Sequence, residues 1–360
     1  MISRNKTVTL METFSQSVML LAVFLGSLVT ATAQTRAADL NKLFGIPADG
    51  RLIVVDNDGN VHLEFKAESI FGFEESCDCA WAEGPDNKWG VIDAKGKWLV
   101  QPKFFSPEPY QTGRYRVTRH AGDKGMIYQF VDLRGEPVFG EYEQAYSFKE
   151  GLAAIRINGK WGFIDERGKL VIPAVYDNTS FFSEGLAYVA KGGDEMFIRP
   201  DGSTAFTFPS DTTSCPSGRM IVNGRTTFCD DDFKAGIVDD SGRIVLPPTY
   251  DKIEVFSEGL APFEQDHAWG YLDLSGRPAI RAQFDEAQRF ASGLAAVEIN
   301  GKWGFIDKTG RLVIAAIYDS IRRPFSKGIA WVELDGRNVF INEAGDLKFT
   351  VEGGKVIKNR

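Results

Sequence analysis

Asn158-Gly-Lys-Trp-Gly-Phe-Ile-Asp-Glu-Arg-Gly-Lys-Leu-Val-Ile-Pro173 returns almost unchanged as Asn300-Gly-Lys-Trp-Gly-Phe-Ile-Asp-Lys-Thr-Gly-Arg-Leu-Val-Ile314. Two copies of this length do not arise by chance. An internal repeat determines the architecture of a whole chain, so its copies have to be counted before any other feature is interpreted.

The first marker of the repeat is an acidic residue followed three positions later by glycine, after a short apolar run. Two copies carry a weaker form, Arg199/Gly202 and Asn342/Gly345, and successive copies are 33 to 40 residues apart. The regular copies are Asp56/Gly59, Asp93/Gly96, Asp132/Gly135, Asp165/Gly168, Asp239/Gly242, Asp273/Gly276 and Asp307/Gly310. The chain therefore contains nine copies of one unit.

Two further markers accompany the first in a constant order. One is a Phe-Ser-Glu-Gly type turn at Phe182–Ala187, Phe256–Ala261, Phe290–Ala295 and Phe325–Ala330. The other is an aromatic residue followed by aspartate, at Tyr176-Asp177, Tyr250-Asp251, Phe284-Asp285 and Tyr318-Asp319. Three markers in one order make the repeat secure.

One repeat unit runs from Leu152 to Pro173. Apolar residues alternate over 153–157, a period of two that predicts a half-buried strand. Asn158-Gly159 tolerates positive φ at both positions and predicts a tight turn into a second strand at 160–165. A turn at 165–168 then leads to a third strand at 169–172, which Pro173 ends, and a short fourth strand is expected near Tyr176-Asp177. The unit is an antiparallel meander.

The predicted fold class is all-β, an array of about nine short antiparallel meanders. We expect an open, curved superhelix, because nothing in the sequence identifies a partner that would join the two ends. A closed β-propeller is the alternative.

Four Trp-Gly pairs mark the second strand of the unit. Tryptophan buries a large apolar area, and the glycine beside it lets a neighbouring backbone approach closely. We interpret the pairs as the structural core of the repeat, with a row of sugar-stacking platforms as the alternative. They are Trp89-Gly90, Trp161-Gly162, Trp269-Gly270 and Trp303-Gly304.

With these residues in hand, the chain resembles the WG-repeat family, which is named for the Lys-Trp-Gly-Phe-Ile-Asp core at 160–165 and 302–307. The resemblance covers about residues 48–349. It implies a bacterial repeat array, often exported and generally treated as an interaction module. It supplies no catalytic residues.

The N-terminus has the order of a secretory signal. Arg4 and Lys6 precede an apolar run at 18–29, and Ala31-Thr-Ala33 offers a cleavage site before Gln34. We expect a signal peptide at 1–33, a linker at 34–47, the array at 48–349 and a C-terminal tail at 350–360. An uncleaved anchor is the alternative, and no later segment is apolar enough to span a membrane.

Charge and cysteine usage fit an exported protein. The formal net charge is −8, which suits a soluble protein but not one that grips nucleic acid. Four cysteines are an even count, typical of disulfides outside the cytoplasm. Because each unit of an array touches only its neighbours, we predict Cys215 paired with Cys229, and Cys77 with Cys79 either joined or free.

No catalytic, cofactor or metal motif stands out. The carboxylates of the markers, with Glu184 and Glu258, could be imagined as a glycosidase pair or as calcium ligands. Each recurs once per unit at a turn, however, where aspartate caps backbone groups. The repeat breaks at Ser203–Asp232 and at Ala67–Asn87, which are either functional insertions or disulfide-stabilised loops.

The sequence predicts a non-enzymatic, exported binding or scaffold protein, without a cofactor, that presents an extended surface to a protein or glycan of the cell envelope. The alternative is a propeller-type hydrolase acting on cell-envelope carbohydrate. A central acidic cleft with two carboxylates outside the repeat positions would favour the hydrolase.

Overall fold

The computed structural model describes residues 44–48, 51–65, 69–74, 77, 79–93, 96–111, 113–208, 212–215 and 218–358. These residues form strands and turns, with two short 3-10 helices, η2 (Pro85–Asn87) and η3 (Gly122–Lys124). The all-β class is therefore confirmed. Within the same residues no helix is long and apolar enough to cross a membrane. The predicted signal peptide lies outside the described residues.

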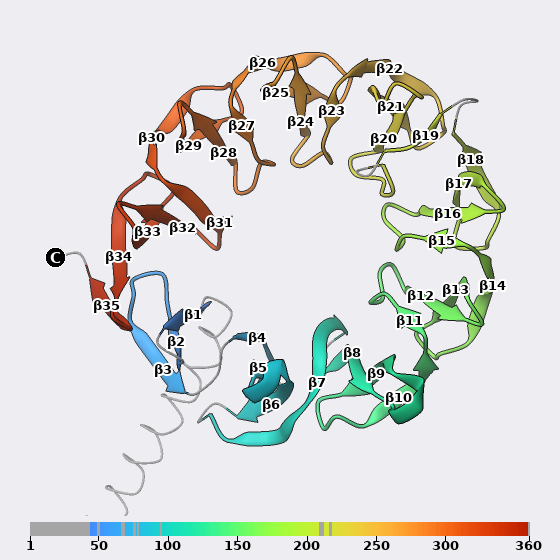
Figure 1. Cartoon of the computed structure of the whole chain (residues 1–360), viewed down its shortest axis with the longest axis horizontal. Coiled ribbons are helices and arrows are strands. Elements are labelled where there is room, and N and C mark those ends of the chain that lie inside the picture. Colours follow the sequence, from blue (N-terminus) through green and yellow to red (C-terminus); the bar gives the residue numbers. More distant parts are fainter. Residues whose placement is uncertain are drawn as a thin grey trace, which may run out of the picture.

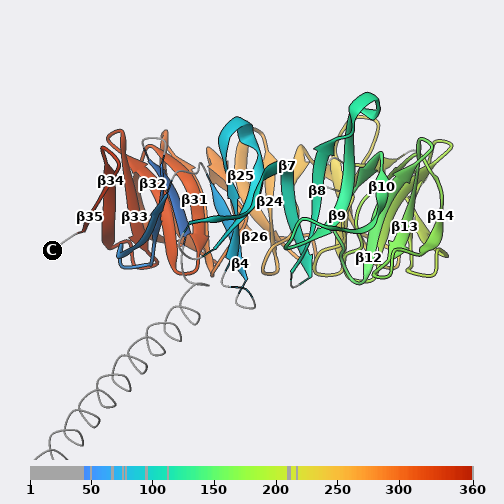
Figure 2. The same ribbon diagram turned by 90° about the horizontal axis from the view of Figure 1, so that it is seen from below.

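Eight antiparallel sheets stand around a ring as the blades of a propeller (Figure 1). Figure 2 shows the ring edge-on, as a shallow band. The first sheet contains β1 (Phe44–Ala48), β2 (Arg51–Val55) and β3 (Val61–Phe65). The second has seven strands: β4 (Ile70–Glu74), β5 (Cys79–Glu83), β6 (Trp89–Asp93), β7 (Trp98–Gln111), β8 (Arg114–His120), β9 (Met126–Asp132) and β10 (Pro137–Tyr142).

Five sheets of four strands follow. They are β11 (Gln144–Ala145), β12 (Leu152–Ile157), β13 (Lys160–Asp165) and β14 (Leu170–Tyr176); β15 (Asn178–Thr179), β16 (Ala187–Lys191), β17 (Asp194–Ile198) and β18 (Thr204–Thr207); β19 (Thr213–Ser214), β20 (Arg225–Cys229), β21 (Ala235–Asp239) and β22 (Ile244–Tyr250); β23 (Lys252–Ile253), β24 (Leu260–Gln265), β25 (Ala268–Asp273) and β26 (Pro278–Phe284); and β27 (Glu286–Ala287), β28 (Leu294–Ile299), β29 (Lys302–Asp307) and β30 (Leu312–Tyr318). The last sheet contains β31 (Ser320–Ser326), β32 (Ile329–Leu334), β33 (Arg337–Asn342), β34 (Leu347–Glu352) and β35 (Lys355–Lys358), so strands continue into the expected C-terminal tail.

The predicted unit is present as the sheet β11–β14. The turn between β12 and β13 has positive φ at Asn158 (51°) and Gly159 (76°), as a two-residue hairpin requires. The expected fourth strand is the two-residue strand that opens each regular sheet. One detail differs from the expectation: Pro173 does not end its strand. It lies within β14, at a bulge of the outer edge strand, where no donor is needed.

All nine acidic-glycine turns close in the same way. The glycine N–H donates to the carbonyl of the marker residue at 2.8–3.0 Å in every copy, including the two weaker ones. Copies two and three share one sheet, which accounts for nine turns in eight sheets. The nine turns counted in the sequence are therefore present, but they belong to eight sheets rather than to nine separate meanders.

The hydrophobic core is a series of clusters around the ring. Phe163 and Ile172 of one sheet pack with Phe182 and Val189 of the next, all four of them buried. Because every blade buries its faces against two neighbours, the ring is stabilised by many similar contacts between adjacent blades.

The expectation of an open superhelix is wrong, and the propeller alternative is correct. The first sheet packs against the last: Ile53 and Val55 share one buried cluster with Phe340, Phe349 and Val351 (Figure 1). Among the described residues these two sheets share no strand. Closure therefore rests on side chains of two apolar faces, which the repeat pattern does not reveal.

Polar contacts surround this closure. Asn57 donates to the carbonyl of Lys327 at 2.6 Å, and the ammonium of Lys348 lies 3.0 Å from the carboxylate of Asp58. Lys358 of β35 donates to the side chain of Asn60. Residues nearly 300 positions apart are thus neighbours.

Candidate functional site

Neighbouring regular blades are joined by a lysine and an aspartate at fixed places in the repeat. Lys160 of β13 pairs with Asp177, which precedes β15 of the next blade, and Asp177 also accepts the backbone N–H of Gly192 at 2.8 Å. The hydrogen bond from Lys160 is the main reason why the pKa of Asp177 is lowered. The same lysine–aspartate tie recurs as Lys234–Asp251 and Lys302–Asp319.

A second set of carboxylates links the Phe-Ser-Glu-Gly type turns. Glu150 accepts the backbone N–H groups of Glu184 and Gly185 at 2.7 and 2.8 Å. Glu184 in turn accepts those of Asn223 and Gly224 in the following blade, both at 2.7 Å. Paired N–H groups in a turn with positive φ form a natural anion cradle, and here the protein's own glutamates fill it.

The remaining marker carboxylates also have structural partners. Glu258 accepts the N–H of Gly293, and Asp165 accepts those of Arg167 and Lys169 at 3.0 and 2.9 Å. These contacts favour the structural interpretation of the markers over a glycosidase pair or calcium ligands. Among the described residues no group of three or more His, Cys, Asp or Glu side chains is placed to hold a metal ion.

The lysine–aspartate tie is broken inside the seven-stranded sheet. Trp89 pairs with Phe104 in the register in which the repeat's tryptophan elsewhere pairs with the aromatic residue before the aspartate. Phe105 therefore stands in the aspartate's place, and β7 runs through this point without interruption. Lys88, directly before Trp89, keeps the place of the lysine.

The hairpin that follows is also irregular. Five residues separate His120 from Met126 in the β8–β9 pair, whereas two residues separate the corresponding partners Ile157 and Lys160. The longer hairpin adds the pair His120–Met126 beyond Arg119, and both Arg119 and His120 line the cleft described next.

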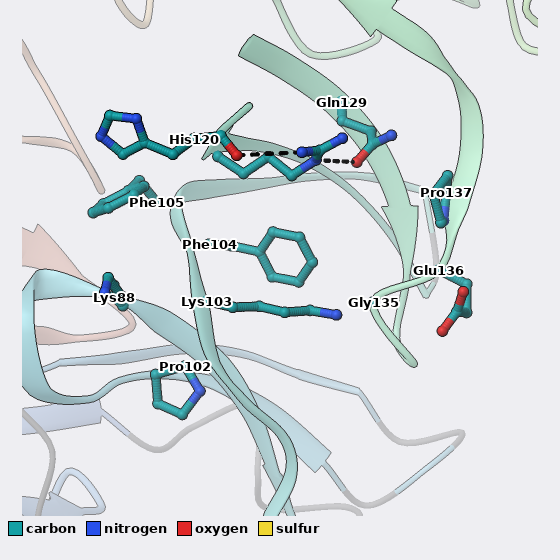
Figure 3. Close-up of a pocket in the computed structure, with 11 residues that line it drawn as sticks. Lys88, Pro102, Lys103, Phe104, Phe105, His120, Gln129, Gly135, Glu136 and Pro137 are labelled. Carbon is teal, nitrogen blue, oxygen red and sulfur yellow. Dashed lines mark hydrogen bonds between the residues drawn. The ribbon is translucent and has the colours of Figure 1, made fainter. Parts of the chain in front are cut away.

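A cleft of roughly 570 Å³ lies at this junction. Figure 3 shows side chains from β7, β8 and β9 and from the β9–β10 turn arranged around it. Its lining residues are Lys88, Pro102, Lys103, Phe104, Phe105, Arg119, His120, Gln129, Gly135, Glu136 and Pro137. We refer to these residues as the junction cleft.

The junction cleft is cationic although the chain as a whole is acidic, with a net charge of −8. Three basic side chains line it, namely Lys88, Lys103 and Arg119, against one carboxylate, Glu136. Arg119 shares its charge with Glu141 outside the lining. Among the described residues the only ion pair of Lys88 is a long one of 3.9 Å to Asp86, and none is found for Lys103. The two lysines are therefore available to an anion.

Beside the cleft lies an unusually polar wall. Gln129, 5% exposed, stands where five copies of the repeat have glycine and accepts a hydrogen bond from Arg119 at 3.0 Å. Arg116, 8% exposed, lies 2.9 Å from Glu108. Burial would raise the pKa of Glu108, but hydrogen bonds from Ser147 and Arg116 keep it below its usual value. Buried polar side chains that are all hydrogen-bonded hold one fixed geometry.

Sequence reasoning missed this site, although its signal was present. The pair Phe104-Phe105 follows the aromatic-aspartate pattern with phenylalanine in place of aspartate, and Gln129 replaces the glycine of Trp-Gly. The two departures lie in different copies of the repeat. Only the fold brings them to one cleft.

The Trp-Gly residues lie in the blades. Trp161 and Trp269 are each 6% exposed, and Trp89 and Trp303 are partly buried. Tyr146 stacks on Trp161 with ring centroids 5.1 Å apart, so one indole face is covered.

The paired glycines face the bulge of the next strand. A Cβ on Gly162 would lie 2.6 Å from the carbonyl oxygen of Ile172, closer than any side chain tolerates. The corresponding contacts are 2.3 Å at Gly90, 2.6 Å at Gly270 and 2.7 Å at Gly304. The expected close approach of a backbone is present at all four.

The structure pairs the cysteines locally, Cys77 with Cys79 and Cys215 with Cys229. Cys215 is 3% exposed and Cys79 is 1% exposed, whereas Cys77 lies at the surface. These two pairs belong to the two breaks of the repeat, and neither break lines the junction cleft.

The break at Ser203–Asp232 is anchored to the preceding blade. Tyr188 donates to one oxygen of Glu195, and the other oxygen accepts the N–H of Ser214, both at 2.6 Å. Burial, together with Glu195, raises the pKa of Tyr188 to about 12. The described part of this break is therefore fixed to the preceding blade by hydrogen bonds, which favours a structural role for it.

A second cleft of roughly 580 Å³ lies between the sheets β23–β26 and β27–β30. It includes Trp269, and its charges are mixed: Lys252 lies 2.7 Å from Glu254, and Arg289 and Glu286 also line it. Its two basic side chains, Lys252 and Arg289, are balanced by two carboxylates, Glu254 and Glu286, so this cleft is the weaker candidate for an anion.

One solved structure supports the fold. The ring is similar to a structure described as the crystal structure of the eukaryotic initiation factor, with 10% identity and a TM-score of 0.61 over 88% of this chain and 96% of that chain. BamB from Moraxella catarrhalis matches at 12% identity and a TM-score of 0.41, over 74% of this chain and 93% of that chain. At these identities the first similarity shows the fold alone. No curated protein matches.

A family model described as WG containing repeat matches residues 89–117, 130–161, 161–193, 236–266, 269–303 and 303–337. These segments cover more than half of the chain and include the strands and turns that build the regular blades. The chain therefore belongs to the family of WG-containing repeat proteins.

Proposed function

We propose that this protein is a binding protein that holds part of a protein or glycan partner in the junction cleft. A propeller of WG repeats suggests a binding or scaffold protein in general. The observation that carries the finer proposal is the coincidence of three departures from the repeat: the missing aspartate at Phe105, the buried Gln129 and the lengthened β8–β9 hairpin all meet at one cleft.

The rest of the ring supports this location by contrast. At three regular junctions the lysine and the aspartate satisfy each other. At the junction cleft the lysine is kept, its partner is not, and additional basic groups surround the place. A cleft with a few polar groups fixed on rigid strands is the usual form of a binding site.

The hydrolase alternative shares the propeller but lacks comparable support. It needs two carboxylates facing one cleft. Glu136 is the one carboxylate that lines the junction cleft. Two carboxylates, Glu254 and Glu286, line the second cleft, but Glu254 is already paired with Lys252 at 2.7 Å. Hydrolase activity remains testable with cell-envelope polysaccharide as substrate, and release of reducing ends would favour this alternative.

We further propose that the protein is exported and meets its partner in the cell envelope. The N-terminal sequence motivates this proposal, and two cysteine pairs at disulfide distance are compatible with an oxidising compartment.

The test is a pull-down from envelope extracts with the immobilised chain and two charge variants. Lys103→Glu reverses a charge in the cleft, and Lys355→Glu makes the same change on the exposed β35 of the last sheet. A retained partner that is lost with Lys103→Glu and kept with Lys355→Glu supports the proposal. Equal retention by both variants places binding elsewhere and refutes it.

A further inference from the structure

We propose that the junction cleft recognises a carboxylate side chain, aspartate or glutamate, of a partner protein, which takes the place of the aspartate that the repeat lacks at Phe105. This inference rests on the proposed function and names the chemistry of its ligand. Its basis is the chain itself, which displays the occupied form of the same site at three other junctions.

The occupied form has two parts. The aspartate pairs with the lysine of the preceding blade and also accepts a backbone N–H from a turn of its own blade, as Asp251 does from Asp266 at 3.0 Å while it pairs with Lys234. One carboxylate thus satisfies two donors. Where this aspartate is missing, the lysine ammonium and the backbone N–H both lack their acceptor.

The junction cleft retains the first part. Lys88 holds the register position of Lys234, directly before the second strand of its unit. Phe105 supplies no carboxylate, and its ring lies near the ring of His120, with centroids 6.3 Å apart. The position that a carboxylate fills elsewhere therefore opens to a cleft of roughly 570 Å³, large enough for an incoming side chain.

The charged side chains of the junction cleft favour a ligand with a single negative charge. Lys103 adds a second ammonium group, while Arg119 is already shared with Gln129 and Glu141. Glu136 at the rim would repel a ligand of higher negative charge such as phosphate. Among the described residues the ammonium of Lys88 has only the long contact of 3.9 Å to Asp86. That of Lys103 lies over the ring of Phe104, 5.0 Å from its centroid. With one rim carboxylate, Glu136, the cleft keeps a net attraction for one carboxylate.

The apolar lining favours a peptide as the carrier of that carboxylate. Phe104, Phe105, Pro102 and Pro137 stand beside the lysines and offer contact to an apolar neighbour of the acidic residue. The regular repeat combines the same two kinds of side chain, because an aromatic residue directly precedes the aspartate that pairs with the lysine, as Tyr176 precedes Asp177. In an aromatic-aspartate segment of a partner, the aspartate would contact the lysines of the cleft and the aromatic ring would contact its apolar residues.

The probe for the experiment is the peptide acetyl-Val-Tyr-Asp-Asn-amide, which copies residues 175–178 of this chain. Its control replaces aspartate by asparagine and so removes only the charge. Calorimetric titration should show that the aspartate peptide binds at least about tenfold more tightly than the asparagine peptide, the change expected when one hydrogen-bonded charge pair is lost.

Variants of the chain make the test specific. Phe105→Asp builds the missing carboxylate into the protein and should abolish binding of the peptide, whereas Phe105→Asn, of similar size but uncharged, should retain it. Lys88→Gln should weaken binding about tenfold. Lys355→Gln should leave it unchanged. If Phe105→Asp fails to fold, the two lysine variants still test the inference: weaker peptide binding by Lys88→Gln than by Lys355→Gln supports it, and equal binding contradicts it.

Two outcomes overturn the inference. Equal binding of both peptides removes the role of the carboxylate, and tighter binding of galacturonate or inorganic phosphate than of the aspartate peptide assigns the cleft to a sugar acid or to phosphate. Failure here is distinguishable from failure of the proposed function. A partner lost with Lys103→Glu but not displaced by the aspartate peptide keeps the cleft as a binding site and rejects only its carboxylate chemistry.

Discussion

Replacing Trp161 by alanine should destabilise the ring by about 3–5 kcal/mol, the usual cost of truncating a buried large aromatic residue. Trp161 is 6% exposed and shares a cluster with Phe163 and Ile172 on the same sheet. A tryptophan buries about 150–250 Å², which at about 25 cal/mol per Å² corresponds to about 4–6 kcal/mol. Neighbouring side chains partly fill the cavity that alanine leaves, so the expected loss of stability is about 3–5 rather than about 4–6 kcal/mol.

The assay is equilibrium unfolding in guanidinium chloride, followed by tryptophan fluorescence and by circular dichroism. Phe233→Ala is the matched control, because Phe233 is an aromatic residue that is 82% exposed and should change stability by no more than about 0.5 kcal/mol. The reasoning fails if Trp161→Ala unfolds at the same denaturant concentration as the parent. Loss of glycan binding in a variant of unchanged stability would restore the platform interpretation instead.

Three further predictions concern pH, the disulfide and export. Burial alone would raise the pKa of Asp239, but hydrogen bonds from Ser241 and Arg243 lower it to about 2. The ionised carboxylate therefore stabilises the fold above pH 3.8, and this stabilisation is lost as the pH falls toward 2. The variant Asp239→Asn should lose less stability on acid titration than the parent, and an identical loss would contradict this. Reduction of the Cys215–Cys229 disulfide should cost about 3 kcal/mol, measured by denaturant unfolding with and without dithiothreitol, and an unchanged unfolding midpoint would contradict this. The purified envelope form should begin near Gln34 by intact mass, whereas a full-length cytoplasmic chain would refute export.

The sequence determined the local structure well because local structure is what a repeat encodes. Alternation predicted the first strand at 153–157, one residue short of the observed 152–157, and the Asn158-Gly159 turn placed the second strand at its observed 160–165. The prediction failed at Pro173, because an outer strand can carry proline at a bulge without losing a hydrogen bond to a neighbour.

Ring closure could not be read in the same way. The residues that close the ring, Val55 and Phe349 among them, belong to the least regular copies and look like ordinary core residues in sequence. Whether two apolar faces meet depends on the small rotation between successive blades, summed around the array. No single residue reports that sum.

The candidate site was missed for a different reason. Catalytic motifs and long insertions can be recognised in a sequence by themselves, whereas this site consists of substitutions within the repeat. Phe105 and Gln129 look unremarkable as single residues. Their significance comes from the register, which places them in positions that aspartate and glycine hold in the regular copies.

The closed ring itself is tested most directly by zero-length cross-linking with a carbodiimide, followed by peptide mass mapping of the monomeric fraction. Asp58 and Lys348 lie 3.0 Å apart and belong to the first and last sheets, so we expect a cross-linked peptide that joins them. The ion pair Lys160–Asp177 between neighbouring blades serves as an internal control, since it forms in an open or a closed array. A map that contains the control link but lacks any link between the first and last sheets would contradict the closed ring.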